Sequence, residues 1–161
     1  MYSDYNYLFN RKAKLKNLFS AFILFPGFRA VSIMRLQFLL QSKRKFRAAM
    51  FVSNLNHMLT GMEVCVGAQI GVPVIVRHPS GIVIGGGSQV GSHCIILQGV
   101  TLGEKYVLNS DGKYPVVGNG VQIGCNSSIL GGVIIGENSV IGAHSLVLSN
   151  VESGQTVYGI H

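Results

Sequence analysis

The sequence predicts a mainly β protein, a parallel β-helix of four to five coils that follows an N-terminal helical segment and carries one expelled loop. Two observations lead to this fold class. Apolar residues recur every six positions from residue 64 onward. The composition also changes abruptly, because only one of the 21 glycines precedes residue 61. We therefore divide the chain into a helical segment, residues 1–60, and a β-helix domain, residues 61–161, with a loop at 104–115.

Branched apolar residues mark each six-residue unit of the repeat. They stand at Val64, Ile70, Val76 and Ile82; after a two-residue slip, at Ile84, Val90, Ile96 and Leu102; and after a break, at Val117, Ile123, Ile129, Ile135, Ile141 and Val147. Small or branched side chains follow four residues later, at Ser88, Cys94, Val121, Ser127, Val133, Ser139, Ser145 and Val151. Neither the period of a helix nor that of a plain strand produces this pattern.

A six-residue period arises when each unit forms one short strand and a turn, so that three units close one triangular coil. The apolar residue then points into the coil axis, and glycine or asparagine supplies the tight or left-handed backbone at the corners. The alternative is a small antiparallel β-sandwich with coincidental spacing. The number of matching positions on both sides of the slip and the break favours the β-helix.

The repeat is interrupted between Leu102 and Val117. Residues 104–115 are polar and rich in turn formers, namely Asn109, Asp111, Gly112 and Pro115. We expect this segment to leave the coil as a loop. Long loops on rigid scaffolds often carry function.

Residues 1–60 have the spacing of amphipathic helices. Three helical stretches are expected, around residues 15–23, 28–38 and 46–58, with Pro26 and Gly27 separating the first two. This segment holds ten basic residues and a single acid, Asp4, which gives it a charge of +9, whereas the remainder of the chain carries −2 and the whole chain +7.

Three uses of the basic helical segment stay open. It could cover the open end of the β-helix, whose strand edges would otherwise be unpaired, and support oligomerisation. It could instead contact a membrane, because four phenylalanines, Phe19, Phe22, Phe25 and Phe28, accompany the basic residues. Nucleic-acid binding is the third use, but no motif for it is present. We favour the cover slightly over membrane contact.

Composition excludes several classes of protein. Hydrophobic residues make up 48% and charged residues 12%, which excludes a disordered chain, and the glycines are not placed at every third position as collagen requires. The cysteines Cys65, Cys94 and Cys125 form no CxxC pair, so neither a disulfide framework nor a zinc site is expected. No secretory signal is visible, and the apolar run from Leu18 to Leu40 is interrupted by charges. We expect a cytoplasmic protein, with membrane association left open.

Four motifs occur in a fixed order: FPGFRAVSIMRL at 25–36, EVCVGAQIG at 63–71, RHPSGIVIG at 77–85 and ILQGVTLG at 96–103. Together with the repeat, they resemble the left-handed β-helix acyltransferases, and within these the serine O-acetyltransferase branch, which includes short relatives that acetylate sugars in capsule or exopolysaccharide pathways. The resemblance covers roughly residues 25–152. It implies a left-handed β-helix and the transfer of an acetyl group from acetyl-CoA to an acceptor hydroxyl.

The resemblance implies that His78 is the general base and that Glu63, where the serine enzymes have aspartate, orients it. A neutral imidazole can accept a hydroxyl proton near pH 7, and a carboxylate on its other nitrogen fixes the tautomer. His57, His93, His144 and His161 match no motif and are interpreted as solvent-facing residues.

Two positions depart from the pattern of the serine enzymes. Arg77 stands where those enzymes carry an aspartate that helps to hold the amino group of serine. Lys113 and Tyr114 stand where their loop has a basic residue and a second histidine. We assign Arg77, Lys113 and Tyr114 to the acceptor site. These departures favour a sugar or polysaccharide precursor as acceptor, with L-serine of cysteine biosynthesis as the alternative.

The resemblance also implies a homotrimer with active sites between subunits and acetyl-CoA lying along the coils. Gly103, Cys125, Gly142 and Ala143 align with the segments that line this groove; each could equally be a plain corner residue. No metal is implied. Two hypotheses from other classes remain, a non-catalytic β-helix scaffold and a membrane-surface binding module.

Overall fold

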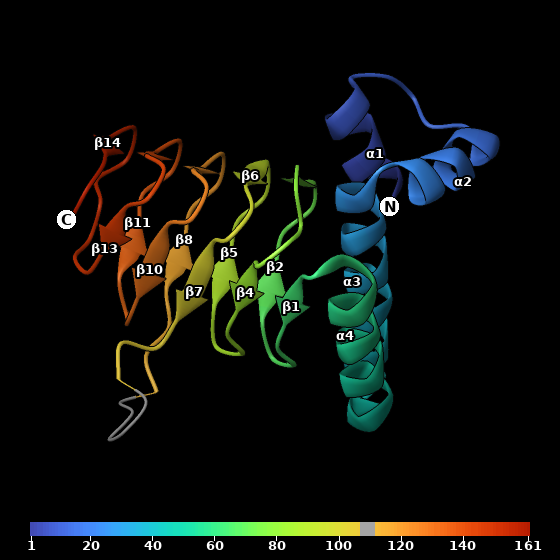
Figure 1. The fold of residues 1–161 in the computed structure, drawn as a ribbon, viewed down its shortest axis with the longest axis horizontal. Helices are drawn as coiled ribbons and strands as arrows, with labels where there is room; N and C mark the ends of the chain where they lie inside the picture. The colour runs from blue at the N-terminus through green and yellow to red at the C-terminus, as the bar shows by residue number, and fades with distance from the viewer. Residues whose placement is uncertain (107–111) are drawn as a thin grey trace.

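The computed structural model describes residues 1–106 and 112–161. Four helices come first, and a β-helix of about four turns follows them. The helices stand at one end of the molecule and the coils stack away from them, so that the C-terminus lies at the opposite end (Figure 1). The predicted fold class is therefore confirmed.

The helices are α1 (Tyr2–Phe9), α2 (Leu15–Leu24), α3 (Pro26–Ser42) and α4 (Phe46–Thr60). Pro26 occupies the first turn of α3, where its missing N–H costs nothing, and Gly61 ends α4 in the left-handed conformation with φ of 75°. Taken together, α2 and α3 have the length and composition of a membrane span, but they are bent by 110° at Phe25, and no single described helix passes that test.

The sequence did not predict α1. Its residues are rich in tyrosine and carry no strong helical period, so local propensity gives little signal. The helix is held by tertiary contacts instead. Tyr5 is buried against Phe9 and Phe28, with ring centroids 4.6 and 5.8 Å apart, and Asp4 is buried beside α3.

In the described part of the chain, fourteen short parallel strands form three sheets, which are the three faces of a triangular prism. Sheet A contains β1 (Glu63–Val64), β4 (Val83–Ile84), β7 (Thr101–Gly103), β10 (Ser128–Leu130) and β13 (Leu146–Val147). Sheet B contains β2 (Gln69–Ile70), β5 (Gln89–Val90), β8 (Val116–Val117) and β11 (Ile134–Ile135). Sheet C contains β3 (Val74–Val76), β6 (Cys94–Ile96), β9 (Gln122–Ile123), β12 (Val140–Ile141) and β14 (Thr156–Val157).

All fourteen apolar positions of the repeat are buried, as are all eight small or branched positions that follow them. Stacked residues of successive coils pair directly; Ile96 lies between Val76 and Ile123 in sheet C. The predicted inward direction of the repeat is therefore confirmed, and the β-helix core is one continuous column.

The two-residue slip in the repeat corresponds to an enlarged corner. Six residues, 77–82, connect β3 to β4, whereas four residues, 97–100, connect β6 to β7 one coil later. Because the extra residues lie outside the strands, Val64 still pairs with Ile84 and Ile84 with Leu102. The slip changes the shape of one corner without disturbing the ladder.

The predicted loop also lies outside the strand ladder. The chain leaves the coil after β7 and returns at β8, where Val90 pairs with Val117, and the next coil continues with Leu102 beside Ile129. Of the turn formers expected there, Asn109 and Asp111 fall outside the described residues.

Polar side chains of α3 and α4 cover the open end of the first coil. The Val64 carbonyl accepts hydrogen bonds from Gln37 Nε2, at 2.9 Å, and from Ser53 Oγ, at 2.6 Å. The Gly67 N–H donates to Gln41 Oε1 at 3.0 Å. These backbone groups have no strand beyond them, so the helices satisfy donors and acceptors that would otherwise be exposed or buried without partners.

A buried ion pair completes this cover. Arg35 donates to both Asp4 carboxylate oxygens and also to the carbonyls of Ile70 and Gly71. The Val74 N–H donates to Asp4 Oδ1 at 3.0 Å. Burial alone would raise the pKa of Asp4, but the hydrogen bond and charge of Arg35, with further hydrogen bonds, outweigh it, and the pKa lies below its ordinary value of 3.8. The pair joins α1, α3 and the first coil.

Replacing Asp4 with asparagine should therefore lower the free energy of unfolding by about 3 kcal/mol at pH 7, because it leaves Arg35 without its counter-charge. The folded-state pKa is the lower one, so the stabilisation is complete above the unfolded-state pKa near 3.8 and is lost as the pH falls through the folded-state value. Urea unfolding of both proteins between pH 3 and 7 checks this. The exposed Glu152→Gln is the control, and a loss that does not shrink at acid pH would contradict it.

Candidate active site

The enlarged corner carries the predicted base. Arg77 and His78 follow β3 directly, and both side chains are exposed, whereas Pro79 next to them is buried and anchors the turn. His78 therefore stands on the outside of the prism, at the coil nearest to the helices. An exposed imidazole at a fixed corner can meet a ligand that lies along the prism.

Three of the four residues predicted to line the CoA groove lie on the same edge of the prism as His78. The strands β3, β6, β9 and β12 of sheet C belong to successive coils, and their last residues pair with one another. Two positions after these last residues stand His78, Gln98, Cys125 and Ala143. We call this the C–A edge; it consists of residues 77–82, 97–100, 124–127 and 142–145. The structure thus aligns His78 with Cys125, Gly142 and Ala143.

A groove of about 310 Å³ runs beside this edge on coils two to four. Its walls are the outward side chains Ile95, Leu97, Gln122 and Val140 together with the backbone around Gly124, Cys125, Gly142 and Ala143. A Cβ on Gly124 would lie 2.5 Å from the Ala143 nitrogen, so only glycine permits the close approach of these two coils. An apolar wall beside exposed backbone suits an extended ligand with amide groups.

Gly103 lies apart from the other three. It ends β7 in sheet A, beside Leu130, where the loop begins. Within one chain it therefore does not line the groove with Cys125 and Ala143.

Glu63 is not bonded to His78 in this structure. Its Oε1 accepts a weak hydrogen bond from Cys65 Sγ at 3.9 Å, and no hydrogen bond or ion pair links it to His78, although both residues are described. Burial, then the charge and hydrogen bond of Glu63, raise the pKa of Cys65 above its ordinary value of 9.0. The carboxylate lies on the outer face of β1, one strand away from the enlarged corner.

Tyr114 lies at a second edge, which we call the A–B edge (residues 65–68, 85–88, 103–106, 112–115 and 131–133). Its ring covers Gly85 and Gly87, and a Cβ on Gly87 would lie 2.2 Å from Tyr114 Cδ2. A hydrogen bond to Glu104, then burial and the charges of Glu104 and Cys65, raise the pKa of Tyr114 above its ordinary value of 10.0. Because Gly85 and Gly87 have no side chains, the Tyr114 ring can pack directly against them.

Lys113 lies further along the A–B edge. Its side chain packs on Gly132, with Lys113 Cβ 3.0 Å from the position of an added Cβ. With Lys105 and Tyr106 it borders a cavity of about 420 Å³. Of the three predicted acceptor residues, only Arg77 thus lies beside His78, and Lys113 and Tyr114 lie on another edge of the same chain.

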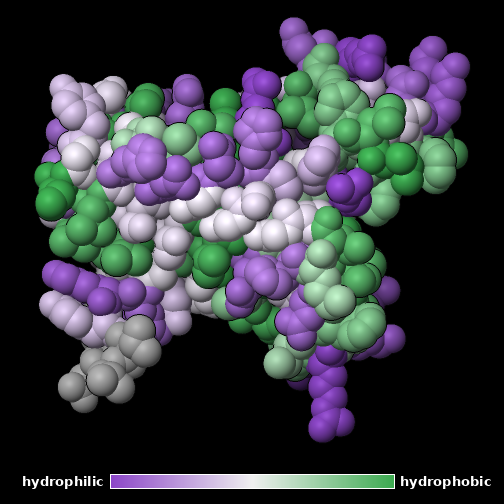
Figure 2. Space-filling model, in the orientation of Figure 1, coloured by the Kyte–Doolittle hydropathy of each residue, from purple (hydrophilic) through white to green (hydrophobic). Residues whose placement is uncertain are grey.

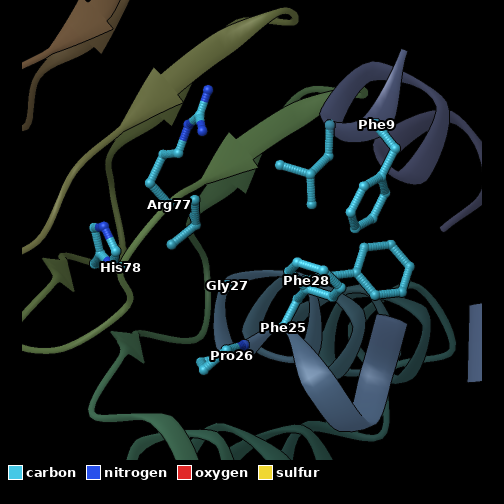
Figure 3. Close-up of a pocket in the computed structure, with 9 residues that line it drawn as sticks. Phe9, Phe25, Pro26, Gly27, Phe28, Arg77 and His78 are labelled. Carbon is cyan, nitrogen blue, oxygen red and sulfur yellow. The ribbon is translucent and has the colours of Figure 1, made fainter. Parts of the chain in front are cut away.

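Sequence reasoning missed an aromatic cavity beside His78. This cavity, of about 390 Å³, is bounded by Arg77 and His78 on one side and by Phe9, Phe25 and Phe28 on the other. Figure 3 shows the aromatic rings gathered from the helical segment, whereas Arg77 and His78 extend from the end of β3. Phe9 and Phe25 meet edge to face, with centroids 4.8 Å apart. The only signal was the run of phenylalanines before residue 29, which by itself indicates a helix core as readily as a cavity wall.

The charge next to His78 is positive. Arg77 is adjacent to it, and none of the residues that line the aromatic cavity is acidic. The nearest acid on the helical side, Asp4, is buried and paired with Arg35. A ligand group placed beside His78 therefore meets a cation and no partner for an ammonium among the lining residues.

Comparison with known proteins identifies the family. The model described as "Bacterial transferase hexapeptide (six repeats)" matches residues 114–149. The serine acetyltransferase of Synechococcus elongatus is 37% identical over 158 residues, which is 98% of this chain and 64% of that protein. The serine acetyltransferase of Helicobacter pylori is 33% identical over 144 residues, 89% of this chain and 84% of the relative.

Solved structures agree with these relatives. The Neisseria gonorrhoeae serine acetyltransferase in complex with serine has a TM-score of 0.83 and 32% identity, and covers 96% of this chain and 63% of its own. A serine acetyltransferase in complex with CoA has a TM-score of 0.79 and 32% identity, and covers 87% of this chain and 57% of its own. This chain thus spans less than two thirds of the S. elongatus relative and of both structures.

The expected sugar acceptor finds no support among these relatives, which favour the serine alternative instead. That expectation gave great weight to Arg77 and Tyr114, two positions in a chain that is similar to a serine acetyltransferase over 98% of its own length. Because the chain is 33% identical to the H. pylori enzyme over 84% of that enzyme's length, it belongs to the serine acetyltransferase family of hexapeptide-repeat transferases.

Proposed function

We propose that this chain transfers the acetyl group of acetyl-CoA to the hydroxyl of L-serine. The observation that carries the proposal is similarity to serine acetyltransferases over nearly the whole chain, including the segment around His78, and to structures of such enzymes with CoA and with serine. The alignment of His78 with a groove along the C–A edge supports it.

In the proposed reaction, His78 accepts the proton of the acceptor hydroxyl while the oxygen attacks the thioester carbon. The tetrahedral oxyanion that forms needs hydrogen-bond donors, and backbone N–H groups of the glycine-rich edge are suited to this. When the intermediate collapses, the carbon–sulfur bond breaks, the ester stays on the acceptor, and the imidazolium returns its proton to the departing thiolate.

The groove suits the arm of CoA. The pantetheine part of CoA is extended, with amides between short apolar segments, and the groove pairs apolar side chains with exposed backbone. Its line toward His78 would bring the thioester end to the base. Cys125, Gly142 and Ala143 keep their assignment as groove residues, and Gly103 requires a neighbouring chain to take part.

A homotrimer would bring together predicted site residues that lie on separate edges of one chain. His78 is on the C–A edge, whereas Lys113, Tyr114 and Gly103 are on the A–B edge. If three prisms pack side by side, the A–B edge of one can face the C–A edge of the next. The loop would then supply Lys113 and Tyr114 to the His78 of its neighbour.

Substitution of His78 by alanine should abolish measurable CoA release from acetyl-CoA with L-serine, because it removes the group that accepts the proton of the serine hydroxyl in the proposed reaction. General-base loss costs roughly 10²–10⁴-fold in rate. The assay follows free thiol with purified protein. His57→Ala, at an exposed position of α4 that lies outside both the groove and the enlarged corner, is the control. Full activity in His78→Ala would overturn the mechanism.

Arg77 should weaken the binding of serine through repulsion of its ammonium group. Like charges about 4 Å apart repel by about 4 kcal/mol at an intermediate dielectric, and solvent at this exposed site reduces the effect. We expect Arg77→Asp to lower the KM for serine about tenfold with little change in kcat. A KM that rises instead would indicate that Arg77 binds the serine carboxylate.

The position of Glu63 can be tested through its neighbour. Glu63→Gln removes the charge that helps to raise the pKa of Cys65, so the thiolate fraction and the alkylation rate of Cys65 should increase severalfold at pH 8. Iodoacetamide labelling followed by peptide mass spectrometry measures this. Glu137→Gln, at a distant exposed site, should leave the rate unchanged. An unchanged rate in Glu63→Gln would place the carboxylate elsewhere.

A further inference from the structure

Helix α2 has an apolar face that no part of the described chain covers. Its inner face packs Leu18 and Ala21 into the small core around Tyr5 and Phe28. Its outer face exposes Leu15, Phe19 and Ile23, one turn apart, and the first two are 77% and 72% exposed. Leu24 and Phe25 extend this exposed surface at the end of the helix.

Basic side chains stand at the start of this face. Arg11, Lys12, Lys14 and Lys16 are all exposed, and no acid occurs between residues 5 and 62. Figure 2 shows hydrophobic surface gathered over the helical end of the molecule, with hydrophilic side chains at its tips. The apolar stripe and the cations therefore form one continuous exposed surface.

The cover of the β-helix does not explain α2. The side chains that satisfy the first coil come from α1, α3 and α4, whereas α2 packs on α3. In Figure 1, α2 lies at the outer side of the helical region, turned away from the coils. The helical segment thus separates into a cover and a projecting helix with a free face.

We propose that α2 and residues 11–16 dock on an anionic membrane surface, independently of the acetyl-transfer reaction. An interfacial helix buries its apolar face at the headgroup boundary while nearby lysine and arginine residues meet anionic lipid. The cations favour a negatively charged partner, and the adjacent phenylalanine and aliphatic side chains favour a lipid surface over nucleic acid, which offers no apolar phase. A second copy of this chain would bring the cations of two helices together.

Co-sedimentation of the full chain with vesicles tests the proposal. We expect binding to vesicles that contain phosphatidylserine, little binding to phosphatidylcholine alone, and loss of binding at high salt. Leu15→Ser with Phe19→Ser should lower the partition coefficient about tenfold or more, because it removes apolar contact without touching the core. Lys12→Gln with Lys14→Gln and Lys16→Gln should lower it on the order of a hundredfold.

Each variant has a matched control. Phe51→Ser with Met58→Ser removes two side chains of similar exposure from α4. Lys43→Gln with Arg44→Gln and Lys45→Gln removes three exposed cations from the turn between α3 and α4. Both controls should keep most of the binding, and all four variants should keep the circular dichroism spectrum and the elution volume of the parent.

Three results would overturn the proposal. Equal loss in the α4 control would indicate general adhesion rather than docking through α2. Binding that survives Leu15→Ser with Phe19→Ser but responds to charge, and that soluble DNA competes away, would indicate a polyanion site. A change in oligomeric state of the α2 variant without vesicles would assign this face to a second copy. None of these results depends on whether the chain acetylates serine.

Discussion

In a parallel β-helix, each coil pairs its backbone N–H and C=O groups with those of the coils on either side. The first coil has no coil on its outer side, so the backbone groups there need other partners. In this protein the partners are side chains of the helices rather than another strand. Gln37, Ser53 and Gln41 take the place of a missing strand at three backbone groups. The Asp4–Arg35 pair then reaches the carbonyls and N–H at the following corner. The strands of each later coil pair with those of the coil before it.

This arrangement fixes where chemistry can occur. The interior is filled by stacked, buried aliphatic residues. Reactive side chains are therefore confined to edges and outer faces, and the edges differ in character. The C–A edge carries His78 and a groove with glycine corners, whereas the A–B edge carries the loop with Lys113 and Tyr114. Within one chain, the residues predicted for the site therefore lie on separate edges.

The sequence predicts the features that follow from the six-residue repeat. It does not predict the features that depend on contacts between residues far apart in the chain. The inward residues from Val64 to Val147, the corner glycines and the expelled loop all follow from a six-residue period, because the coil leaves each position only one environment. The period says nothing of α1, whose helix depends on Tyr5 and Asp4 finding partners far along the chain. It also does not give the rotamer of Glu63, which meets Cys65 here, or the aromatic cavity, which forms only where α1, Phe25 and the start of α3 meet the end of β3. Arg77 illustrates a different limit. The charge of this one residue favoured a sugar acceptor, whereas the similarity of the whole chain to serine acetyltransferases favours serine.

The stacked coils also act as a molecular ruler. Neighbouring parallel strands are about 4.8 Å apart, so the level of Cys125 is about 10 Å from that of His78, and the level of Ala143 about 14 Å. These separations depend on counting coils and not on the identity of any side chain. The two extra residues beside His78 leave the count unchanged, because they widen a corner and keep Val64 opposite Ile84. Inserting a whole coil between His78 and Ala143 would increase their separation along the axis by one strand spacing and keep the strand pairing. Inserting part of a coil within a strand would disrupt the strand pairing itself.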